Sequence, residues 1–224
     1  MTALEVEVDP GEAGFDAKRL GRLSTHLNKY VDRGLLPGVN VLVSRGEEIV
    51  YRHMYGARDM ERALPVEADT IYRFYSMTKP ITSIAIMQLY EQGLFQLKDP
   101  ISRWIPSFAG SQVFSGGNAL EPQTRDATRD ISVHDLLTHT SGLTYHFHMA
   151  HHVDEMYRRA GFDWTKSPGD LESQCDILAS LPLLFDPGSE WNYSYSTDVL
   201  GLSLIHISEP TRPERISYAV FCLK

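Results

Sequence analysis

Apolar positions in the first quarter of the chain follow two different periods. Between Phe15 and Gly34, leucines at positions 20, 23 and 27 are followed by apolar residues at 30 and 31. This spacing of three or four residues predicts an amphipathic helix, and a glycine after such a run is typical of a helix end. Residues 37–56 instead alternate apolar and polar side chains around positions 45–47, which predicts a β-hairpin.

A second helical pattern follows Ser76. Apolar side chains at positions 81, 84, 85, 87 and 89 predict a largely buried helix, which Gly93 is placed to end. Residues 97–106 indicate a turn and a short helix, and residues 133–137 and 153–160 indicate two more short helices. Residues 107–130 are rich in glycine and polar side chains and are expected to form a surface loop.

Ser76 and Lys79, at the start of this helix, are a candidate nucleophile and its base. Residues three apart are neighbours on a helix surface, so the Lys79 amine can reach toward the Ser76 hydroxyl and act as its base. A serine at a helix N-terminus also lies where N–H groups and the helix dipole favour a developing negative charge. The simpler alternative is that Ser76 only caps the helix, since Ser-x-x-Lys arises often by chance.

Four segments, which occur along the chain in the order that the family has, resemble the serine beta-lactamase and penicillin-recognising enzymes. The resemblance is closest to the class C-like branch, which includes esterases. The segments are residues 74–82 around Ser76, the expected hairpin at 37–56, the His-Thr-Ser-Gly stretch at 131–143, and residues 185–201. The resemblance covers about residues 14–202. It implies an α/β fold of the α+β type, with an antiparallel sheet flanked by helices and a mainly helical region that carries Ser76.

The same resemblance assigns roles to three further residues. Tyr193 corresponds to the family's catalytic tyrosine, which relays a proton between lysine and serine. His139 and Tyr195 are placed among the substrate-binding residues. Tyr195 stands where the family's Tyr-x-Asn box has an asparagine that contacts the substrate amide, and this departure favours small acyl esters over lactams and peptides.

The end of the chain departs further from the family. No Lys-Thr-Gly or His-x-Gly motif follows Tyr193, so we expect the C-terminal part of the fold to be missing and the chain as given to be inactive. The helix expected after Asp198 shows no continuation, and residues 207–213 resemble a translated sequencing adapter. We therefore divide the chain into an N-terminal extension (1–13), a partial family domain (14–202) and a non-native tail (203–224).

Composition excludes several other classes of protein. The chain has 224 residues, is 42% hydrophobic and 22% charged, and carries a formal net charge of -8. It can therefore bury a core, but it offers no basic surface for nucleic acid. Without a recognisable signal peptide or membrane-spanning stretch, a cytoplasmic location is expected. Two cysteines, Cys175 and Cys222, provide no disulfide framework.

Six of the nine histidines lie between His134 and His152, which raises the alternative of a metal site. No acidic partner stands at a typical zinc-enzyme spacing, so we expect these histidines near the substrate site and no cofactor. The expected partner is a small ester or lactam. A non-catalytic binding or regulatory module and a D-Ala-D-Ala peptidase remain the alternatives.

Overall fold

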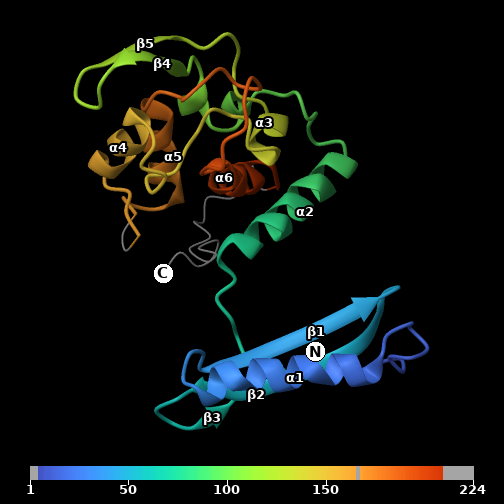
Figure 1. Ribbon diagram of the computed structural model, residues 1–224. Coiled ribbons are helices and arrows are strands. Elements are labelled where there is room, and N and C mark those ends of the chain that lie inside the picture. Colours follow the sequence, from blue (N-terminus) through green and yellow to red (C-terminus); the bar gives the residue numbers. More distant parts are fainter. Residues whose placement is uncertain (1–4, 165–166, 209–224) are drawn as a thin grey trace. The chain divides into compact units, whose positions relative to one another are not determined.

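The computed structural model describes residues 5–164 and 167–208, which form two compact units divided after Arg73. In the first unit, helix α1 (Ala17–Asp32) accompanies an antiparallel hairpin of β1 (Gly38–Arg45) and β2 (Glu48–Asp59), and β3 (Leu64–Pro65) adds to β2 (Figure 1). The side chain of Asp16 caps α1, and Gly34 follows the helix with a φ of 70°. The predicted helix and hairpin are therefore confirmed.

Helix α1 is held to β2 by polar contacts at alternate strand positions. Tyr51 bonds Ser24 at 2.7 Å, His53 bonds Asn28 at 2.7 Å, and Tyr55 donates to Asp32 at 2.9 Å. Because successive strand side chains point to opposite faces, these three positions share the face that meets the helix.

The second unit is mainly helical. Its helices are α2 (Thr78–Glu91), α3 (Val133–Leu137), α4 (His152–Arg159), α5 (Leu171–Ser180) and α6 (Ser196–Ser208), with short 3₁₀ turns η1 (Tyr75–Met77), η2 (Ile101–Arg103) and η3 (Pro106–Phe108). Helix α6 packs against α2, α3 and α5 (Figure 1). Its fully buried Val199 and Leu200 belong to the same apolar core as Ile86, Leu136 and Leu178.

The surface loop predicted over residues 107–130 is wrong. This segment begins with η3 and contains a second antiparallel hairpin, β4 (Gln112–Gly117) and β5 (Pro122–Asp126), with a bridge from Val113 to Leu183. Every residue of β5 is exposed, and Val113 is the buried residue of β4. A strand without an apolar face has no period-two signal, so composition alone suggested a loop.

Helix α2 ends before Gly93 as predicted, but its predicted burial is wrong. Ile86 is 0% exposed, whereas Ile81 is 53% and Ile84 is 61% exposed. Within the second unit, α6 is the main element that packs on α2. An all-round apolar pattern shows that a helix can be buried, not which side its neighbours cover.

The prediction that the last helix would not continue is also wrong. Helix α6 extends to Ser208 and buries Ser203 and Ile207. The boundary at 202/203 thus falls inside a packed helix. The assignment of residues 203–224 to a non-native tail stays a prediction, and Pro210, Pro213 and Cys222 lie outside the described residues.

A buried carboxylate anchors the segment that leads into the His-Thr-Ser-Gly turn. Asp135, 2% exposed, accepts two hydrogen bonds from Arg129, at 2.6 and 2.9 Å. It also accepts from the backbone N–H and hydroxyl of Ser132, whose own side chain caps α3. Burial raises the pKa of Asp135, but the hydrogen bonds from Arg129 and Ser132 outweigh it, and the net pKa is lowered.

We expect Asp135→Ala to lower the free energy of unfolding by about 2–3 kcal/mol, the order of a lost helix cap plus unsatisfied hydrogen-bond donors. Because folding depresses the pKa of Asp135, its stabilisation is complete above about pH 4 and is lost as the pH falls through the folded-state pKa. Urea unfolding at several pH values measures both effects. A difference between wild type and Asp135→Asn that stayed constant toward pH 2 would contradict this account.

Candidate active site

Ser76 lies in η1, immediately before α2, and is exposed. Tyr75, directly before it, has a φ of 48°, an uncommon value for a residue with a side chain. This left-handed residue turns the chain sharply ahead of the helix. Lys79 follows one turn later and is half-buried. The structure thus places the predicted nucleophile at the start of a helix, on an accessible surface.

Tyr193 is brought to Ser76 from 117 residues further along the chain. Its hydroxyl donates to Ser76 Oγ at 2.8 Å. Tyr193 lies just before α6 in the chain. Because α6 packs against α2, the Tyr193 phenol lies next to Ser76, which immediately precedes α2. This distance is normal for a hydrogen bond between two hydroxyl groups.

Lys79 lies against the tyrosine ring, with no hydrogen bond to the serine among the described residues. Its Nζ lies 4.8 Å from the centre of the Tyr193 ring and 5.6 Å from that of Tyr145. Burial raises the pKa of Tyr193, but Lys79 and Ser76 outweigh it, and the net pKa is lowered. No hydrogen bond joins Lys79 to Ser76 in the part of the chain that the structure describes. Tyr193 therefore contacts both Ser76, through its hydroxyl, and Lys79, through its ring.

Asp198 is a charged neighbour that the sequence pattern did not single out. It is half-buried in the first turn of α6, five residues after Tyr193. Burial raises its pKa to about 6, and Lys79 acts in the opposite direction. Its negative charge also contributes to raising the pKa of Tyr145 and opposes the lowering at Tyr193. The sequence feature that could have identified Asp198 is a carboxylate in the first turn of an otherwise apolar helix.

His139 lies against the tyrosine, in the left-handed conformation with a φ of 57°. Its ring centre is 4.9 Å from that of Tyr193 and 6.3 Å from that of Trp191. Burial and then the Lys79 charge lower its pKa, which favours a neutral imidazole. Gly142, three residues on, completes the turn with a φ of 86°, and a side chain there would meet the Phe185 carbonyl at 2.5 Å.

Tyr195 does not take the position predicted for it. It is 6% exposed, and its hydroxyl is hydrogen-bonded to His146 Nδ1 at 2.6 Å rather than turned to Ser76. Its ring packs against Tyr145, 4.4 Å away between centres, and against Phe162. Burial raises its pKa. A phenol is larger than the asparagine amide, and an apolar cluster surrounds it, so Tyr195 serves as a core residue.

Two of the other histidines stabilise local structure. His148 is hydrogen-bonded to Thr144, and His151 caps α4. Within residues 5–164 and 167–208, no group of three or more His, Cys, Asp or Glu side chains is arranged to hold a metal ion. Cys175 is buried and free, and burial raises the pKa of its thiol.

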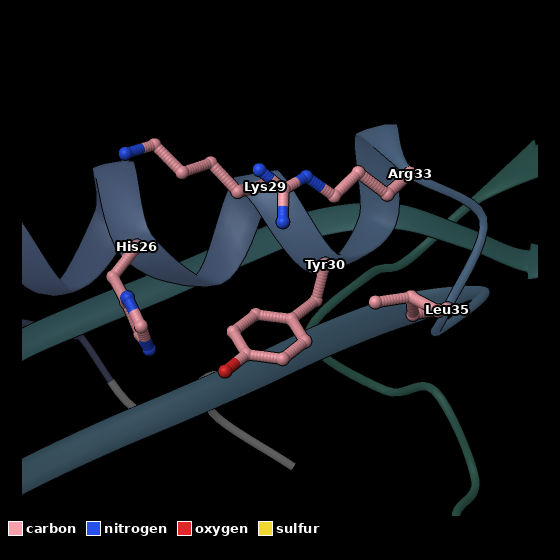
Figure 2. A pocket seen from close by; sticks show the side chains of 5 residues that line it. All are labelled: His26, Lys29, Tyr30, Arg33 and Leu35. Carbon is pink, nitrogen blue, oxygen red and sulfur yellow. The ribbon is translucent and has the colours of Figure 1, made fainter.

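A separate hollow lies on the first unit. Figure 2 shows it beside α1, lined by His26, Lys29, Tyr30, Arg33 and Leu35. The rings of His26 and Tyr30 meet edge to face, 5.2 Å apart between centres.

The site brings together an exposed serine, a phenol of lowered pKa that is hydrogen-bonded to it, and a lysine whose amine lies against the phenol ring. The beta-lactamase family matches residues 23–215, which is most of the chain. The protein therefore belongs to the beta-lactamase family. The family and the beta-lactamase/transpeptidase-like fold predicted from the sequence motifs are confirmed.

Known relatives include esterases and acyltransferases. Esterase EstB from Burkholderia gladioli is 35% identical over 209 residues, covering 90% of this chain and 48% of the relative. A methylbutanoyltransferase from Penicillium citrinum, mlcH, is 34% identical and covers 89% and 48%. The structure of EstCE1, a hydrolase with promiscuous acyltransferase activity, is 32% identical with a TM-score of 0.70 and covers 86% and 47%.

The chain thus spans about half the length of the curated relatives it matches. None of its described helices is both long and apolar enough to cross a bilayer.

Lys79→Met tests the electrostatics of this site independently of any activity. The Lys79 charge lowers the pKa of Tyr193 and of His139, so both pKa values should rise when that charge is removed. NMR titration of ¹³C-labelled tyrosine and ¹⁵N-labelled histidine measures them. Lys98→Met, which removes an exposed lysine elsewhere, is the matched control and should leave both values unchanged. An unchanged Tyr193 pKa in Lys79→Met would refute the assigned role of Lys79.

Proposed function

We propose that this chain carries the acylation site of a serine hydrolase that acts on small acyl esters. The observation that carries the proposal is the 2.8 Å hydrogen bond between Tyr193 and Ser76, with the Lys79 cation against the same phenol. Ser76 is the nucleophile, Tyr193 its proton acceptor, and Lys79 the charge that stabilises the phenolate. In this proposal Tyr193 takes the role of direct base that the spacing of the motif suggested for Lys79.

In the proposed reaction, the Tyr193 phenol first releases its proton to solvent and becomes the phenolate that the Lys79 charge stabilises. Ser76 Oγ then attacks the ester carbonyl, and the serine proton moves to the Tyr193 phenolate. The C–O bond of the tetrahedral intermediate breaks, and Tyr193 returns the proton to the leaving alcohol. Water then attacks the acyl-serine through the same proton path, releasing the acid and restoring Ser76. The N-terminus of α2 and its preceding turn provide a favourable potential for the oxyanion.

Two features support an ester over a lactam or a peptide as the substrate. Tyr195 occupies the position of the family's amide-binding asparagine and is turned into the core, which leaves that contact unmade. The similar proteins also include EstB, an esterase. Acyl transfer to an alcohol is the second candidate, because mlcH is a methylbutanoyltransferase and an alcohol would replace water in the deacylation step.

Covalent labelling tests the proposed nucleophile. Intact-mass spectrometry after exposure to a fluorophosphonate should show one adduct on the wild-type chain and none on Ser76→Ala. Tyr193→Phe removes the proton acceptor and should slow labelling by about 10²- to 10⁴-fold, the range of general-base catalysis. Tyr90→Phe, on α2 and packed against Phe95, is the matched control and should label at the wild-type rate.

Two outcomes would count against the proposal. A folded wild-type chain that formed no adduct would contradict an activated Ser76 in this chain and would agree with the inactivity expected from the missing C-terminal motif. Labelling of Tyr193→Phe at nearly the wild-type rate would remove Tyr193 from the proton path and return that role to Lys79.

A further inference from the structure

His139 contacts the chain on both sides of Tyr193. Its backbone carbonyl accepts the Asn192 N–H at 2.9 Å, and its ring Nδ1 accepts the Ser194 N–H at 3.3 Å. The ring itself packs against Tyr193. His139 therefore contacts three consecutive residues, 192–194, and the middle one is Tyr193.

A series of hydrogen-bonded serine hydroxyl groups also connects the segment after Tyr193 to the turn that contains His139. Ser194 Oγ lies 3.4 Å from His139 Nδ1 and 2.7 Å from Ser196 Oγ, which in turn lies 2.8 Å from Ser141 Oγ. Ser141, Ser194 and Ser196 are buried. Since Ser141 belongs to the same turn as His139, the two segments 139–141 and 192–196 are joined at both ends.

We propose that His139 is a positioning residue that holds Tyr193 against Ser76 through its Nδ1 acceptor and its backbone carbonyl. It does not contact substrate in this assignment, which replaces the substrate-binding role that the sequence motif implied. The contacts of His139 with residues 192–194 are given by the geometry alone. Their effect on the reactivity of Ser76 rests on the proposed function.

The contacts specify the protonation state of the imidazole. A ring nitrogen that accepts from a backbone N–H has no proton of its own, so a neutral His139 must carry its proton on Nε2. The titratable groups that face the ring are Lys79 of α2 and Tyr193 ahead of α6. Burial and the Lys79 charge both oppose a cationic imidazole, and protonation of Nδ1 would break the bond to Ser194.

The left-handed backbone at His139 allows a matched pair of substitutions. Asparagine and glycine both tolerate a φ of 57°, so neither His139→Asn nor His139→Gly adds backbone strain. The asparagine Oδ1 is as far from the backbone as the histidine Nδ1 and can accept from Ser194. Glycine removes the acceptor. His134→Asn is the control, because no side-chain hydrogen bond of His134 is found among the described residues.

Fluorophosphonate labelling of Ser76 in the full 224-residue chain measures the consequence. His139→Gly should label about tenfold more slowly than wild type, the effect of one lost hydrogen bond on the orientation of Tyr193. His139→Asn should recover most of that loss, and His134→Asn should match wild type. Equal rates for His139→Asn and His139→Gly would overturn the role of the Nδ1 acceptor.

NMR of the ¹⁵N-labelled chain tests the contacts themselves. The imidazole nitrogens of His139 should show a proton on Nε2, and the Ser194 amide should shift in His139→Gly much more than in His139→Asn. A proton on Nδ1 would overturn the proposal. Because this reading needs no reactivity, a wild-type chain that failed to label would refute the proposed function and still leave the contacts tested.

Discussion

Burial of α6 among α2, α3 and α5 is the constraint on which the rest of the site depends. The helix places Val199 and Leu200 in the core of the second unit. Tyr193, Ser194 and Tyr195 immediately precede it, so their positions follow from where the helix docks. Residues 117 apart in the chain meet at 2.8 Å because an apolar helix face is removed from water there.

Three tyrosines in this unit show how position changes the chemistry of one side chain. Burial and the Asp198 charge raise the pKa of Tyr145 and of Tyr195, which remain neutral phenols. Tyr193 is less buried and lies against Lys79 and Ser76, which lower its pKa. The tyrosine whose pKa is lowered is therefore the one that is hydrogen-bonded to Ser76.

The clearest sequence patterns were the ones confirmed. Leucine spacing over residues 15–34 predicted α1, and alternation over residues 37–56 predicted the hairpin of β1 and β2. The hairpin at 112–126 was missed because its strands have almost no apolar face. The predicted burial of α2 failed for the opposite reason, since apolar side chains surround that helix but neighbours cover only part of it.

The sequence by itself determined the local pieces of the site. The spacing of Ser76 and Lys79 places them one helical turn apart, and the family motifs pointed to Tyr193 and His139. Only the tertiary structure decided that Lys79 lies against the Tyr193 ring, that Tyr195 turns into the core, and that the Lys79 charge influences the pKa of Asp198. Helical spacing follows from backbone geometry within a few residues, whereas the direction and pKa of a side chain follow from neighbours that only packing brings together.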